Sequence, residues 1–120
     1  MGTTQWVIMK FGGTSVASVD RWSTIQQQSG ARLAAGERPI VVCSAISGVS
    51  DALEHIISAC GSGTEDGALL ALRERHASLA TALSVDVETE IGGELSEIES
   101  LVRGANLVGE ISPRLHARLM

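Results

Sequence analysis

The residues best suited to chemistry lie in the segment VIMKFGGTSV, residues 7–16. An apolar run ends at a single lysine, and two glycines and two hydroxyl side chains follow shortly after it. Glycine lets backbone N–H groups approach a ligand without interference from a Cβ atom. An ammonium group, amides and hydroxyls in one loop favour a bound anion, above all a phosphate. The candidate residues are Lys10, Gly12, Gly13, Thr14 and Ser15.

The order of these residues excludes two common nucleotide-binding motifs. In a P-loop the lysine comes after the glycines, whereas here it comes before them. The GxGxxG fingerprint of dinucleotide-binding proteins follows neither of the apolar segments described below. Taken alone, KFGGTS also fits a tight turn with a solvent-exposed lysine, so a second feature is needed to favour a binding site.

Two short apolar segments are predicted to be buried β-strands: Gln5–Lys10, and Ile40–Val42 leading into Cys43. A helix is predicted between them, with Ser18 as its N-cap and Gly36 at its C-terminal end. Strand, helix and strand form a βαβ unit, in which the two strands are parallel. Their continuous apolar character predicts a sheet that is covered on both faces.

A second loop, SAISGVSD, follows the second predicted strand and supplies three more hydroxyl groups. These belong to Ser44, Ser47 and Ser50, which surround Gly48. Because the carboxyl ends of parallel strands meet at one edge of a sheet, this loop is expected to converge with the first one. Hydroxyls, amides and one lysine around a common space suit phosphoryl transfer, which needs mostly positioning and charge stabilisation from the protein.

The chain after the second loop is predicted to be helical. A helix is expected over Asp51–Cys60, and GSGTEDG at residues 61–67 is expected to be a flexible loop. Apolar residues beyond it recur at helical spacing, and Ser112–Pro113 is a typical helix start. We therefore expect a βαβα unit at residues 1–60, which carries both loops, and a helical region at residues 61–120.

The composition excludes several classes of protein. The 120 residues are 44% hydrophobic and carry a net charge of −5, so no general attraction to nucleic acid or acidic membranes is expected. No apolar run is long enough to span a bilayer, and the N-terminus lacks the pattern of a signal peptide. A cytoplasmic protein is the simplest expectation.

The other reactive side chains are predicted to be structural. Cys43 is expected to pack inside its strand, and neither Cys60 nor the three histidines have the spacing of metal ligands. No metal-ligating residue is therefore predicted, and His76 is expected to be a hydrogen-bonded core residue. The acidic residues between Glu88 and Glu99 are expected to form a solvated helix face.

Two strands alone are not a stable unit when they are parallel. We therefore expect residues 1–120 to be the N-terminal segment of one larger domain, and thus an incomplete domain. The alternative is a self-contained helical domain with a small sheet.

The two loops and their flanking segments resemble a known family. VIMKFGGTSVAS followed by PIVVCSAISGVSDAL resembles the N-terminus of the aspartate kinases, in the amino acid kinase family. SPRLHARLM, at the end of the sequence, resembles the helix that leads into a Gly-Glu pair in these enzymes. The resemblance implies an α/β fold: the N-terminal part of an α/β/α sandwich with a mainly parallel, carbamate kinase-like sheet.

The resemblance also implies a reaction. With the assistance of Mg²⁺, ATP would transfer its γ-phosphoryl group to the β-carboxylate of L-aspartate. The product would be 4-phospho-L-aspartate, in the first step of lysine, threonine and methionine biosynthesis. The implied partners are therefore the small molecules ATP and L-aspartate, and the family alone implies a homodimer.

The resemblance further implies roles for individual residues. Lys10 would be the catalytic residue, because it would bind the ATP phosphates and stabilise the charge that develops during transfer. Ser44 would lie near the transferred group, and Ser50 would contact aspartate at a position where the family usually has threonine. The implied ATP-binding residues are Lys10, Phe11, Gly12, Gly13, Thr14 and Ser15. The implied substrate-binding residues are Ser44, Ser47, Gly48 and Ser50.

Several alternatives stay open at this point. The substrate could instead be glutamate, acetylglutamate, carbamate or UMP, as in other amino acid kinases. A non-catalytic phosphate-binding or assembly module is the alternative outside enzymes. The longer protein could also be fused to homoserine dehydrogenase or to diaminopimelate decarboxylase. In each case the 120-residue chain alone is expected to lack kinase activity, because half of the site would be absent.

Overall fold

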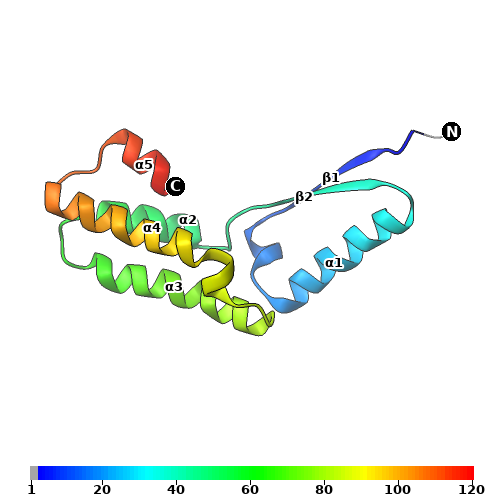
Figure 1. The fold of residues 1–120 in the computed structure, drawn as a ribbon, viewed down its shortest axis with the longest axis horizontal. Coiled ribbons are helices and arrows are strands. Elements are labelled where there is room, and N and C mark those ends of the chain that lie inside the picture. Colours follow the sequence, from blue (N-terminus) through cyan, green and yellow to red (C-terminus); the bar gives the residue numbers. More distant parts are fainter. Residues whose placement is uncertain (1–2) are drawn as a thin grey trace. The chain divides into compact units, whose positions relative to one another are not determined.

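The computed structural model describes residues 3–120, which form two compact units (Figure 1). The first unit ends at Gly48, and the second spans Val49–Met120. The first contains strand β1 (Trp6–Phe11), the 3₁₀ turn η1 (Gly13–Val16), helix α1 (Val19–Ala34) and strand β2 (Arg38–Cys43). The second contains the helices α2 (Val49–Ser58), α3 (Glu65–Ala82), α4 (Val87–Val108) and α5 (Pro113–Leu119). The predicted mixed α/β class is confirmed.

Helix α1 begins and ends at the residues that local chemistry predicts. The side chain of Ser18 accepts a 3.4 Å hydrogen bond from the backbone N–H of Arg21, which caps the N-terminus. At the other end Gly36 has φ +79°, a left-handed conformation that glycine adopts at little cost. The N–H of Glu37 then donates to the carbonyl of Arg32, which completes a Schellman motif.

The two strands pair in parallel, as predicted, with Ile8 opposite Ile40 and Phe11 opposite Cys43. The expectation that both faces would be covered is wrong for this unit. Side chains alternate between the faces of a strand, and Phe11 packs with Ile25 of α1 on one face. On the other face the side chain of Ile8 is 73% exposed, because no element of this unit lies against it.

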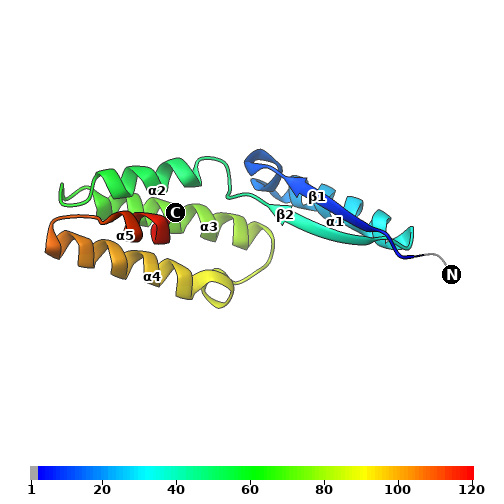
Figure 2. The same ribbon diagram turned by 90° about the horizontal axis from the view of Figure 1, so that it is seen from above.

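The second unit is built from helices, and α2, α3 and α4 lie alongside one another (Figure 2). Leu72 of α3, and Leu95 and Val102 of α4, are buried, which confirms the helical spacing seen in the sequence. Helix α2 begins two residues earlier than predicted, at Val49. Helix α3 begins at Glu65, inside the segment that was predicted to be a loop.

Helices α4 and α5 begin with side-chain caps. The carboxylate of Asp86 accepts a 3.2 Å hydrogen bond from the N–H of Thr89, and Ser112 accepts one of the same length from Leu115. Pro113 occupies the first turn of α5, as predicted. Within residues 3–120, no helix combines the length and the apolar character that crossing a membrane requires.

Candidate phosphate-binding site

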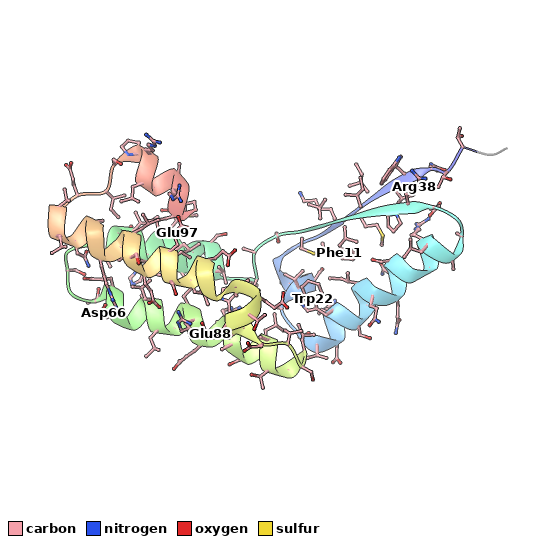
Figure 3. The ribbon with its side chains drawn as sticks, viewed as in Figure 1. Phe11, Trp22, Arg38, Asp66, Glu88 and Glu97 are labelled. Carbon is pink, nitrogen blue, oxygen red and sulfur yellow. The ribbon has the colours of Figure 1, made fainter. Side chains whose placement is uncertain are left out.

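The first loop is a tight turn that rests on the core of its unit. After β1 the backbone is extended at Gly12, and η1 then closes with a 3.0 Å hydrogen bond from the N–H of Ser15 to the carbonyl of Gly12. Val16 is 1% exposed, and its carbonyl accepts a 2.9 Å hydrogen bond from the indole N–H of Trp22. Figure 3 shows Trp22 on α1, below the end of β1 that carries Phe11. The loop is thus held by α1 as well as by its strand.

The second loop meets the first one directly. The ladder between the strands ends at Phe11 and Cys43, and the N–H of Ser44 donates a 3.0 Å hydrogen bond to the carbonyl of Phe11. One further contact lies beyond the sheet, where the N–H of Ser47 donates a 3.1 Å hydrogen bond to the carbonyl of Gly13. The predicted convergence of the two loops is therefore confirmed for their backbones.

The adjacent glycines of the first loop have different surroundings. A Cβ atom on Gly13 would lie 3.0 Å from the carbonyl oxygen of Ala45 and 3.1 Å from the nitrogen of Ser47. The close packing of one loop against the other therefore favours glycine at position 13. A Cβ atom on Gly12 would meet nothing within 4 Å, and its φ of −77° is open to any residue. The fold of the described chain gives no reason for glycine at position 12.

The side chains of the first loop divide between the core and the solvent. Phe11 is 9% exposed and belongs to the core, so only its backbone is available to a ligand. Lys10 and Thr14 are exposed, and Ser15 is half-buried. By the alternation of the strand, Lys10 lies on the same open face as Ile8.

The hydroxyl groups of the second loop belong to two different units. Ser44 and Ser47 are exposed beside the first loop, and the hydroxyl of Ser44 donates a 3.3 Å hydrogen bond to the carbonyl of Ala45. Gly48 has φ +83° and ends the unit. Ser50 lies in the first turn of α2, in the second unit. The first unit therefore brings together every predicted site residue except Ser50.

The two loops have a local electrostatic character that differs from that of the whole chain. The net charge is −5, yet residues 11–18 and 44–50 contain no carboxylate. Lys10 is the only lysine in the sequence, and it stands at the start of the first loop. One cation beside hydroxyls and backbone amides can hold an anionic group, and residues 11–18 and 44–50 contain no acidic side chain that opposes it. Asp51, the last residue of SAISGVSD, lies in the first turn of α2.

The structure also tests the side chains that were predicted to be structural. His76 is half-buried, and its Nδ1 lies 2.8 Å from the carbonyl oxygen of Leu72, as expected for a hydrogen-bonded core residue. Cys43 is exposed, so its predicted packing inside a covered strand is wrong. The cause is the open face and edge of the two-stranded sheet. Among residues 3–120, no cluster of three or more His, Cys, Asp or Glu side chains could hold a metal ion.

Some acidic residues of α4 form ion pairs with arginines of other helices, so the predicted solvated face is only partly correct. Arg73 of α3 forms ion pairs with both Glu88 and Glu99, the second at 3.2 Å. Arg118 of α5 pairs with Glu97. The prediction from the sequence missed these pairs because the arginines come from other helices.

A polar network around Asn106 was also not predicted from the sequence. Its carboxamide oxygen accepts hydrogen bonds from the N–H of Gly61 and the thiol of Cys60, each at 2.8 Å. Its nitrogen donates to the carboxylate of Glu65 at 2.5 Å, and Glu65 is only 8% exposed. Burial, together with the negative charge of Glu65, raises the pKa of the Cys60 thiol. The network thus joins the α2–α3 loop to α4, a helix that lies far from this loop in the sequence.

The first unit is thus of the α/β class, with a glycine turn and a serine loop at one edge of two parallel strands. A comparison with protein families gives this class a name: residues 5–120 match the model of the amino acid kinase family. The chain belongs to the amino acid kinase family, whose members are phosphotransferases that act on small molecules. No match to an individual curated protein was found.

Proposed function

We propose that this chain is the phosphate-loop segment of an aspartate kinase. The proposed reaction transfers the γ-phosphoryl group of ATP to the β-carboxylate of L-aspartate. The family supports phosphoryl transfer, and the pairing of KFGGTS with SAISGVSD favours aspartate over the other substrates of the family.

One observation carries most of this proposal. The Ser47–Gly13 hydrogen bond and the close packing at Gly13 hold the glycine turn against the serine loop. Amides and hydroxyls from both loops are thereby gathered near the end of the strand that carries Lys10. Such pre-positioned donors are what the protein supplies in phosphoryl transfer.

The residues of the two loops fit the phosphates of ATP better than they fit a metal ion. The open space around Gly12 leaves room for a phosphate to approach the backbone, and Lys10 is an exposed cation. Because residues 11–18 and 44–50 carry no carboxylate, they do not supply the ligands that Mg²⁺ prefers. When bound to the phosphates, Mg²⁺ would neutralise part of the charge of the transferring group.

Each residue then has a proposed task. Lys10 would bind the phosphates and offset negative charge as the γ-phosphoryl group leaves. Gly12 and Gly13 would contribute backbone N–H donors, and Thr14 and Ser15 would add hydroxyls. Ser44 would lie near the group that aspartate receives, and Ser47 and Gly48 would bind aspartate. The resemblance to the aspartate kinases gives Ser50 of α2 a contact with aspartate as well.

We further propose that residues 1–120 are the N-terminal part of a larger kinase domain. The exposed apolar face of the sheet supports this, since Trp6 is 59% and Ile8 is 73% exposed. Apolar strand residues of this kind are normally covered in α/β proteins. In the complete domain, further elements would cover this face and supply the rest of the nucleotide site.

Two assays test the proposed function. The 120-residue chain alone should show no phosphoryl transfer above background, whereas the polypeptide that includes any coding sequence after Met120 should phosphorylate aspartate. The second assay offers that longer polypeptide aspartate, glutamate, acetylglutamate, carbamate and UMP in parallel. Activity with one of the other substrates and none with aspartate would exclude the proposed substrate. Binding of ATP without transfer to any acceptor would favour the non-catalytic module.

A further inference from the structure

The second unit contains a groove whose lining residues all belong to this unit. It has a volume of about 470 Å³, and its walls are mainly apolar side chains of α2, α3 and α4. They include Leu53, Leu72, Leu95 and Ile98. The last residues of the chain complete the wall, because Arg118, Leu119 and Met120 also line the groove. In Figure 2 helix α5 lies between α2 and α4.

Helix α5 is held in this position by few contacts. Leu119 is its buried residue, with 4% exposure. Two polar contacts lie at the exposed edges: the Nε2 atom of His116 is 3.2 Å from the carboxylate of Glu54, and Arg118 pairs with Glu97. A helix of seven residues does not persist by itself in water. Its order therefore depends on these contacts.

We propose that α5 is a strap over this groove, and that protonation of His116 tightens it. A protonated imidazole attracts the carboxylate of Glu54 by its positive charge, whereas a neutral ring can offer it only an uncharged N–H donor. The Arg118–Glu97 pair contains no histidine, so it does not depend on the protonation of an imidazole. Loss of the proton therefore weakens one of the two polar contacts and loosens the strap.

Two other ionisable side chains line the groove, and a third is adjacent to Glu54 in the sequence. Glu94 of α4 lines the groove. His76 of α3 also lines it, but the Nδ1 atom of this histidine is committed to the carbonyl of Leu72 on its own helix. His55 is exposed on α2, next to Glu54 in the sequence. Both of these histidines therefore need their own controls.

Hydrogen–deuterium exchange of the 120-residue protein tests the proposal. Exchange is measured at about pH 5.5 and about pH 8 and corrected for the intrinsic rate at each pH. In the wild type, the protection of residues 113–119 should be about two- to fivefold lower at the higher pH, the effect of losing one exposed ion pair. His116→Gln and Glu54→Gln should each remove this difference, and His55→Gln and His76→Gln should keep it.

Three results would overturn the proposal. One is the same pH dependence in the wild type and in His116→Gln. Another is a change of equal size in α3 and α4, since that would report global stability instead of the strap. The third is an α5 without protection at either pH, because the helix would then not be docked.

Discussion

The backbone N–H of Ser47 donates a 3.1 Å hydrogen bond to the carbonyl oxygen of Gly13, and the nitrogen of Ser47 lies 3.1 Å from where a Cβ atom on Gly13 would be. One residue of the glycine turn is thus fixed against the serine loop, while its neighbour Gly12 faces open space. Packing therefore accounts for glycine at position 13 but not for glycine at position 12.

Gly13→Ala should destabilise the protein by about 1–3 kcal/mol, the usual cost of forcing an extra group into a packed site. The new Cβ would press on the backbone of Ala45 and Ser47, which cannot rotate away. Urea unfolding measures the effect. Gly12→Ala is the matched control, and its free energy of unfolding should stay within about 0.5 kcal/mol of the wild type. An equal loss in both variants would contradict the distinction between the two glycines.

Lys10 can be probed selectively because it is the only lysine of the chain. We expect ATP with Mg²⁺ to slow the acylation of Lys10 by an amine-reactive ester, because bound phosphates would contact its ammonium group and shield it from the reagent. Peptide mass spectrometry follows the reaction. The N-terminal amine is the control within the same molecule, and its rate should not change. Equal rates at Lys10 with and without nucleotide would count against its proposed role.

The features predicted correctly from the sequence are those set by local chemistry. Ser18, Gly36 and Ser112–Pro113 mark helix ends because their own side chains or φ angles satisfy the backbone there. The parallel pairing and the meeting of the two loops follow from the order of strand, helix and strand.

The features that were missed depend on partners far along the sequence. The exposure of Ile8 and Cys43 depends on what covers the sheet, and two apolar strands carry no signal of that. Glu65 stands in a glycine-rich segment that is typical of an exposed loop, yet it is buried because Asn106 of α4 donates to its carboxylate. No local pattern links these two residues.

The two cysteines should react at different rates. Cys43 is exposed, whereas burial and the charge of Glu65 raise the pKa of Cys60, so Cys60 has less of the reactive thiolate at neutral pH. Iodoacetamide should therefore label Cys43 first, as seen by peptide mass spectrometry. Glu65→Gln should speed the labelling of Cys60 and leave that of Cys43 unchanged. Faster labelling of Cys60 in the wild type would contradict the described network.

The N-cap of α4 predicts a pH dependence of stability. Hydrogen bonds from the hydroxyl and the N–H of Thr89 lower the pKa of Asp86 below its usual value. A lowered pKa in the folded state adds stability at neutral pH, which is lost as the pH falls through that pKa. Asp86→Asn keeps an oxygen for the cap but cannot ionise. The wild type should be the more stable at about pH 7, and the difference should shrink below about pH 4.

Thermal unfolding of both proteins across this pH range checks the prediction. Thr89→Val serves as a control, because it removes the hydroxyl donor and should reduce the same difference. A difference that stays constant or widens in acid would contradict the assigned cause of the pKa shift.

The most direct test of the proposed site is a titration of the ¹⁵N-labelled chain with ATP and Mg²⁺, followed by NMR. Binding to the phosphate loops alone is expected to be weak, with a dissociation constant of about 1 mM. The largest shifts should occur at the amides of residues 12–15 and of Ser44 and Ser47, and Lys10→Met should suppress them. Shifts confined to residues 49–120, or an unchanged response in Lys10→Met, would contradict a phosphate site built from these two loops.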